Sequence, residues 1–241
     1  MKISRFILAL SASAALSSIS HAADLPTMKS APAPAPIYAQ GYNWTGFYIG
    51  GYAGGSFGSA KVSDVTSPNF LNIPNFSPDG FTAGGLAGYS IQFNSFVVGA
   101  EGEFGYDGRR ASASYVGGGG DIRTTKFEGS YIGRIRGDVG YAFDNILVYV
   151  AGGVSFADAK LSVFRPANGF GQSQTAQLVG YNVGAGIRYA FTRNWIARVE
   201  YIYDGFNSHT YDFLSQNPNG FDNRKAKYNE NTVRAALEYK F

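Results

Sequence analysis

Apolar and polar residues alternate one by one along several segments of the chain, most clearly in YIGRIRGDVGYAF, residues 131–143. Bulky apolar side chains stand at odd positions of this segment, at Tyr131, Ile135, Val139 and Tyr141, and even positions include Arg134, Arg136 and Asp138. Successive side chains of a β-strand point to opposite faces. The alternation therefore predicts a strand with one charged face and one apolar face, and we assign Phe127 to the apolar face as well.

The same alternation recurs along the rest of the chain and predicts eight strands. They lie near residues 46–59, 81–91, 96–106, 125–141, 146–160, 175–190, 195–205 and 226–241. Each apolar portion is about ten residues long, which is enough for a tilted strand to cross the hydrocarbon layer of a membrane. None of these segments keeps apolar residues at the three-and-four spacing of an amphipathic helix.

The connections between these strands alternate between short and long. Each short one follows a strand-end tyrosine and contains Asn94, Asn145 or Asn194, a residue type that favours turns. The long ones are polar, for example DGRRASASYVGGGGDIRT at residues 107–124. Short periplasmic turns and long external loops are typical of outer-membrane barrels. We therefore predict an all-β fold, an eight-stranded antiparallel up-and-down transmembrane β-barrel with both termini periplasmic.

Charged residues share one face of the predicted strands, and we predict that this face lines the barrel lumen. The predicted network consists of Glu101, Glu103, Arg134, Arg136, Asp138, Arg188, Arg198, Glu200, Arg234 and Glu238. This face is rich in glycine and carries both signs of charge, whereas the apolar face carries aromatic residues toward the strand ends. An arginine facing lipid at mid-depth would cost about 2–4 kcal/mol. The inverted arrangement, a soluble periplasmic lipid-binding barrel, is the alternative.

Two interpretations of this network stay open. The charges could line a conduction path for ions, as in a narrow porin, or they could form a packed polar core. We favour the core, because the interior of an eight-stranded barrel is only just wide enough for its side chains. A buried charge without a partner is expensive, so the network should be nearly fully paired.

The first residues of the chain predict an export signal. Lys2 and Arg5 precede an apolar core, and small residues follow it. We expect residues 1–22 to be a signal peptide that is cleaved between Ala22 and Ala23. The apolar run is too short and too rich in serine for a transmembrane anchor.

Composition supports an exported membrane protein with a tether before its barrel. Apolar residues make up 45% of the chain, yet the mean hydropathy is only -0.11, so no long apolar block dominates. The alternating Ala-Pro run in residues 23–44 predicts an extended periplasmic tether, with a disordered N-terminal tail that has no role as the alternative, and residues 45–241 form the predicted barrel. The chain has no cysteine, which excludes disulfides and thiolate metal sites.

Catalytic and cofactor chemistry have little support in the sequence. His209 has Ser208 and Asp212 nearby, but a flexible external loop would not hold a catalytic triad in place. We expect no enzyme activity, no cofactor, no metal site and no nucleic-acid surface. A weak candidate for heme ligation remains around the last loop: His209, Tyr203, Tyr211 and Tyr228.

Four motifs stand out along the chain: ADLP at Ala23, WTGFYIGGYAGGSFG at Trp44, the GYAF turn at Gly140 and the terminal RAALEYKF. They resemble motifs of the small outer-membrane β-barrel proteins of alpha-proteobacteria, a family with major surface antigens, porin-family proteins and hemin-binding members. The resemblance implies that Tyr239 and Phe241 form the signal read by the barrel-assembly machinery.

The sequence therefore predicts a structural protein of the outer membrane that supports envelope integrity and presents external loops. Its expected partners are outer-membrane lipid and lipopolysaccharide, the assembly machinery, and host or environmental ligands at the loops. The alternatives are a narrow porin for small solutes or ions and a hemin-binding or adhesive surface protein.

Overall fold

The computed structural model describes residues 41–64, 77–116, 120–167, 169–213 and 223–241. The predicted signal peptide, its cleavage site at Ala22 and Ala23, and most of the predicted tether lie outside these residues. Every regular element in the described ranges is a strand, and they contain no helix that is long and apolar enough to cross a membrane.

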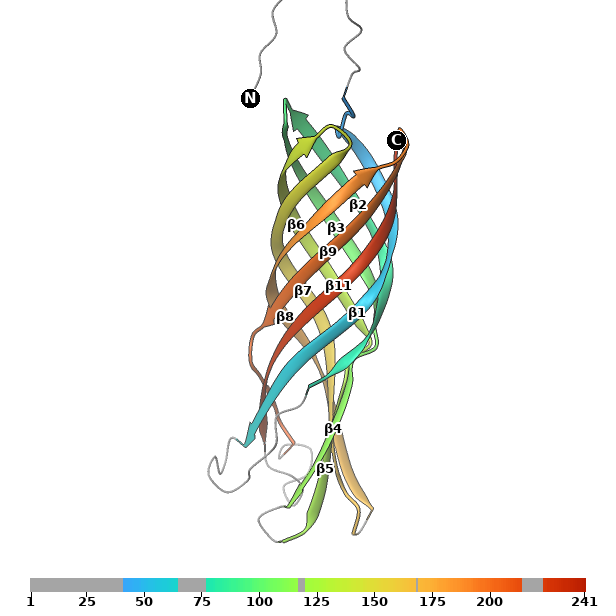
Figure 1. The fold of residues 1–241 in the computed structure, drawn as a ribbon. Coiled ribbons are helices and arrows are strands. Elements are labelled where there is room, and N and C mark those ends of the chain that lie inside the picture. Colours follow the sequence, from blue (N-terminus) through green and yellow to red (C-terminus); the bar gives the residue numbers. More distant parts are fainter. Residues whose placement is uncertain (1–40, 65–76, 117–119, 168, 214–222) are drawn as a thin grey trace, which may run out of the picture. The chain divides into compact units, whose positions relative to one another are not determined.

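Eight strands form a closed antiparallel ring (Figure 1). In chain order they are β1 (Gly46–Asp64), β2 (Asp79–Phe93), β3 (Phe96–Asp107), β6 (Tyr131–Phe143), β7 (Ile146–Arg165), β8 (Phe170–Ala190), β9 (Trp195–Phe206) and β11 (Arg224–Lys240). Each pairs with the next, and β1 pairs with both β2 and β11, so the ring has no open edge. The predicted eight-stranded barrel is confirmed.

Short turns gather at the end of the ring where β1 begins and β11 ends (Figure 1). In the β2–β3 turn, Asn94 adopts a φ of 56°, as its predicted turn role requires. In the β6–β7 turn the positive φ of 57° falls on Asp144, and the predicted turn residue Asn145 is the second residue of the same turn. Asn and Asp tolerate this left-handed conformation better than other residues that have a side chain.

The strand predicted at residues 125–141 is wrong, because the structure divides it into β5 (Ile122–Glu128) and β6. The backbone N–H groups of Ser130 and Tyr131 leave the ladder and donate to Asp158 Oδ1 at 2.7 and 2.8 Å. The break exchanges the two faces, so Phe127, predicted on the apolar outer face, is buried with 0% exposure.

The stretch predicted as a loop at residues 107–124 instead contains most of a hairpin, β4 (Arg110–Val116) and β5. β5 pairs with the far part of β7, from Lys160 to Phe164. A further short strand, β10 (His209–Tyr211), pairs with the start of β11. The hairpin and the long β7–β8 pair extend the wall beyond the ring, opposite the short turns (Figure 1). We call β4, β5 and the parts of β7 and β8 beyond Ala157 and before Leu178 the external extension.

The outer face of the ring is apolar. Aliphatic side chains such as Ile135 and Val199 occupy its middle, with exposures of 66% and 62%. Aromatic side chains cluster near the short turns, at Phe93, Phe96, Tyr141, Phe143, Tyr189, Phe191 and Trp195, and near the opposite end, at Phe57, Phe81, Phe104, Tyr106, Phe156 and Tyr181. An apolar band between two aromatic girdles is the surface that a lipid bilayer requires.

Candidate functional site

The candidate site is the lumen of the ring. All ten residues of the predicted charge network lie there, and none is more than 7% exposed. β3, β6, β8, β9 and β11 supply them, because each strand places alternate side chains on its inward face. The ten comprise five arginines and five carboxylates, so their formal charges cancel.

One half of the network, toward the external end, is built on shared carboxylates. Arg134 donates to Glu103 at 2.6 Å and holds Asp204 through two hydrogen bonds of 2.9 and 2.7 Å. Arg234 contacts both Glu103, at 2.5 Å, and Glu200, at 2.7 Å. Arg136 also pairs with Glu200. Each of the two glutamates therefore serves two arginines, which couples four strands across the lumen.

The other half lies nearer the short turns. Arg198 donates two hydrogen bonds of 2.9 and 2.5 Å to Glu101 and also pairs with Glu238. Arg188 lies farther from the carboxylates, at 3.5 Å from Glu101 and 3.7 Å from Asp138. Its guanidinium group instead sits over aromatic rings.

Aromatic side chains inside the lumen support this second half. The guanidinium carbon of Arg188 lies 4.6 Å from the ring centre of Tyr149 and 5.0 Å from that of Tyr48. The Tyr48 hydroxyl donates to Glu101 at 2.9 Å. Such cation–π contacts and hydrogen bonds offset part of the cost of taking the charges out of water.

The predicted charge network left out several residues that line the lumen. Asp204 follows Glu200 by four positions and Glu230 precedes Arg234 by four, so each shares the inward face. Tyr48 and Tyr52 share the face of Gly50 and Gly54, a face for which we predicted small and charged residues. Tyr52 packs 4.3 Å from the guanidinium carbon of Arg234.

A segment before β1, residues 41–45, closes the lumen at the short-turn end. Trp44 is 2% exposed, and its indole N–H donates to the backbone oxygen of Asp144 at 3.1 Å. Its backbone N–H donates to Gln92 at 2.8 Å, and the Tyr42 hydroxyl donates to the backbone oxygen of Arg193 at 3.2 Å. Since these partners lie on or beside three different turns, the segment is fastened across the mouth. We call it the mouth strap.

An apolar cluster fills the lumen at the external end. Phe127, Tyr211 and Phe213 have 0% exposure, and Phe206 and Tyr228 pack with them. The rings of Phe206 and Tyr228 are stacked with centroids 5.6 Å apart. Apolar side chains thus lie at both ends of the ionic lumen, and at the external end Arg109 is buried beside Tyr228 and pairs with Asp107 and Glu230.

The heme candidates are divided between the two faces of the wall. His209 lies on β10 with its ring 5.2 Å from that of Tyr211. Tyr211 and Tyr228 point inward, where their hydroxyls donate to Ala159 O at 3.2 Å and Glu230 at 2.8 Å. Tyr203 contributes to a groove on the outside. Within the described ranges no group of three or more His, Cys, Asp or Glu residues could hold a metal ion.

The predicted assembly residues lie on the outer face at the short-turn end. Phe241 is 67% exposed and its ring lies 5.8 Å from that of Phe47. Tyr239 packs edge-on against Trp195 at 5.2 Å. Both therefore belong to the aromatic girdle near the turns.

Known proteins are similar to this chain in sequence or in fold. The family described as "Outer membrane protein beta-barrel domain" matches residues 9–241. The 31 kDa outer-membrane immunogenic protein of Brucella melitensis is 33% identical over 88% of this chain and 89% of its own. The 22 kDa outer membrane protein of Rhizobium leguminosarum bv. viciae is 31% identical over 86% of this chain and 82% of its own.

Among solved structures, the outer membrane protein OprG of Pseudomonas aeruginosa superimposes with a TM-score of 0.52, covering 84% of this chain and 98% of its own at 12% identity. That likeness shows the fold alone. The family match and the relatives identify this chain as an outer-membrane protein that belongs to the outer membrane protein β-barrel family of alpha-proteobacteria.

Proposed function

We propose that this chain is a structural, non-conducting protein of the outer membrane whose barrel supports the envelope and presents external loops. The observation that carries the proposal is the filled lumen. The ten ionic side chains of the predicted network occupy its middle together with Asp204, and clusters of apolar side chains that include Trp44 and Phe127 lie at its two ends.

A pore through this eight-stranded barrel would need a continuous polar path from one end of the lumen to the other. Here the path meets the buried indole of Trp44 at one end and the rings of Tyr211, Phe213 and Phe127 at the other. In between, arginines and carboxylates hold one another at hydrogen-bond distance, so a passing ion would have to break buried ion pairs.

Single-channel recording in planar bilayers tests this proposal. We expect purified, folded protein to give no stable conductance steps, while a reference pore in the same bilayers shows that the assay works. Stable, ohmic steps from the wild-type chain would contradict the sealed lumen and favour the narrow-porin alternative.

Surface presentation is supported by the relatives, whose names describe outer-membrane immunogenic proteins. An epitope inserted at Gly120, in the β4–β5 connection, should bind antibody on intact cells. The matched control is the same epitope at Asn94 in the β2–β3 turn, which should bind only after the outer membrane is permeabilised. Antibody binding on intact cells at Asn94 but not at Gly120 would mean that the short turns face outward, opposite to the proposed orientation.

Recognition of the last strand by the assembly machinery is part of the same proposal, and the exposed ring of Phe241 supports it. Deleting Phe241 should leave the chain in the periplasm or degraded. Replacing Phe47, the aromatic neighbour of Phe241 in the girdle, with alanine is the control and should leave insertion near normal. Equal insertion of the truncated and wild-type chains would remove the assembly role.

A further inference from the structure

Three lysines stand on the outer face of the wall, just beyond the apolar band at its external end. Lys225 and Lys227 lie on β11 and Lys61 on β1, and all three are exposed. Along β11 the outward side chains change from Leu237, Ala235 and Val233, through Asn231 and Asn229, to these lysines. The order places the ammonium groups where hydrocarbon gives way to the head groups of the outer leaflet.

The lysines repel one another, and no ion pair between the described side chains includes any of them. Lys61 and Lys227 are direct cross-strand partners on the same face. Side chains in that relation have Cβ atoms roughly 5 Å apart, and like charges there are destabilising. The buried carboxylates of the lumen, such as Glu103 and Glu200, pair with arginines on the inward face and leave these outward lysines to the surroundings of the wall. An anion bound between these lysines would relieve their repulsion.

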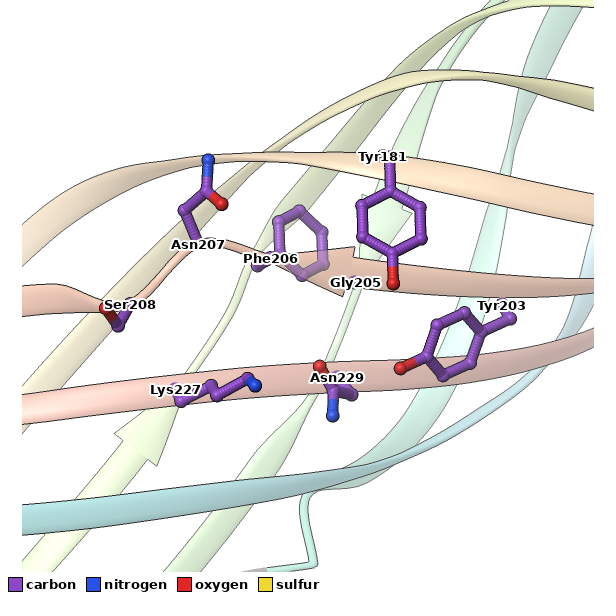
Figure 2. Close-up of a pocket in the computed structure, with 8 residues that line it drawn as sticks. All are labelled: Tyr181, Tyr203, Gly205, Phe206, Asn207, Ser208, Lys227 and Asn229. Atoms are coloured by element: carbon purple, nitrogen blue, oxygen red, sulfur yellow. The ribbon is translucent and has the colours of Figure 1, made fainter.

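A groove of about 320 Å³ adjoins the lysines, where β9 ends between β8 and β11. Figure 2 shows Lys227 and Asn229 on one side of it, Tyr181 and Tyr203 at one end, and Asn207 and Ser208 after the end of β9. These side chains offer an ammonium group, amides and hydroxyls. They suit a ligand that carries both phosphate and sugar hydroxyls.

The groove depends on a glycine. A Cβ atom at Gly205 would lie 2.7 Å from the ring of Tyr181, so a larger residue would push that ring aside. Gly205 lines the groove together with this ring. An aromatic ring beside hydroxyl and amide groups provides a face against which a sugar can pack.

We propose that Lys61, Lys225, Lys227 and the adjoining groove bind the phosphorylated head group of an outer-leaflet glycolipid. The lysines neutralise phosphate, and the tyrosines and amides contact the sugar. The site lies at the level of the lipid head groups on the lipid-facing wall, which favours a membrane lipid over a soluble ligand. The inference rests on the outer-membrane location of the chain and not on the sealed lumen.

Native mass spectrometry of the full folded chain in maltoside micelles tests the proposal. Diphosphorylated lipid A and the same lipid without phosphates are added in parallel. Wild-type protein should bind the phosphorylated form more tightly. The double variant Lys61→Gln, Lys227→Gln should lose about 30-fold in affinity for it, because each lysine near a charged membrane surface contributes about fivefold.

The double variant Lys126→Gln, Lys160→Gln is the matched control, because both lysines are exposed on the external extension. It should bind as the wild type does, and heat-modifiable migration checks that both variants are folded. Equal affinity of wild type for the two lipids, or wild-type affinity in the Lys61→Gln, Lys227→Gln variant, would overturn the proposal. Displacement of the lipid by low millimolar inorganic phosphate would overturn it in favour of a free-phosphate site.

A stability measurement separates repulsion between the lysines from a general effect on folding. In micelles without lipid A, Lys61→Gln should be at least as stable as wild type, because it removes a like-charge pair. With phosphorylated lipid A present, the order should reverse. A variant that is less stable under both conditions would contradict a site built on neutralised repulsion.

Discussion

β5 and β6 follow one another with only two residues between them, yet the charged side chains of β6 point inward and Lys126 of β5 points outward. In β6, Arg134 and Arg136 point inward and Ile135 points outward. In β5, Phe127 points inward and Lys126 points outward. β6 belongs to the ring, whereas β5 belongs to the external extension, beyond the aromatic girdle.

The difference follows from the solvent on the outside of the wall. Next to acyl chains the outer face must be apolar, so ionisable groups are confined to the lumen and must be paired there. Next to water the outer face tolerates lysine, and the hydrophobic effect moves the large apolar side chains inward. The two-residue break changes which positions face inward, just where the surroundings change.

We expect the largest loss of stability when an arginine is removed from the ion pairs of the lumen. Arg198→Ala leaves the carboxylates of Glu101 and Glu238 buried without their strongest partner and should reduce the free energy of unfolding by about 3–5 kcal/mol. Guanidinium unfolding in micelles, followed by tryptophan fluorescence, measures it. The adjacent Val199→Ala, on the outer face, should change the free energy by about 0.5 kcal/mol or less. Equal losses would mean that the lumenal pairs carry no special weight.

The next largest loss is expected when an apolar side chain is shortened inside the external extension. Leu161 has 0% exposure and pairs with Phe127 inside the extension, so Leu161→Ala should destabilise that region by about 2–5 kcal/mol. Limited proteolysis should then cut β4 and β5 faster, while the ring keeps its heat-modifiable migration. Lys160→Ala, exposed beside it, serves as the control. Loss of the whole barrel in Leu161→Ala would show that ring and extension unfold as one unit.

An arginine can be placed on the outer face of the ring and, separately, on the outer face of the external extension to compare their surroundings. Val199→Arg faces acyl chains in the middle of the ring and should cost about 2–4 kcal/mol. Ser173→Arg, on the exposed outer face of β8 in the extension, should change the free energy of unfolding by about 0.5 kcal/mol or less. Similar costs at the two positions would place both in the same solvent and contradict the boundary between them.

Much of the ring could be predicted from the sequence because a lipid-facing strand obeys a strict period. Its outer residues must be apolar, so the alternation around Ile135 and Val199 identifies the strands and the inward face of each. The period does not identify inward tyrosines such as Tyr48, since an aromatic ring fits a polar lumen when cations lie over its face.

The external extension could not be predicted from the sequence, because a wall that faces water does not need a strict apolar period on its outer face. Residues 107–124 are rich in serine and glycine, and a water-exposed hairpin needs only a few inward apolar residues, such as Tyr115 and Phe127, to pack. The break before Tyr131 depends on Asp158, which accepts two backbone hydrogen bonds from a different strand. Contacts between residues this far apart leave no local pattern. The mouth strap is similar, because Trp44 finds its partners on turns 48 and 100 residues away.

The smallest expected effect concerns an ion pair in water. Asp121, at the β4–β5 connection, accepts a hydrogen bond from Arg123 at 3.0 Å and lies 2.7 Å from Arg165 at the end of β7. The hydrogen bond from Arg123 and the charges of both arginines hold the pKa of the Asp121 carboxyl below its usual value. Its contribution to stability is therefore present at neutral pH and declines as the pH falls through that lowered pKa.

Asp121→Asn should lower the stability of the extension by less than about 1 kcal/mol at pH 7, because exposed ion pairs are screened by solvent. Proteolysis rates of wild type and variant should converge on acidification and at high salt. Arg198→Ala should show no such convergence with salt, because its carboxylate partners are buried. If Asp121→Asn cost as much as Arg198→Ala, burial from water would not be what separates the ionic lumen from the charged surface of the extension.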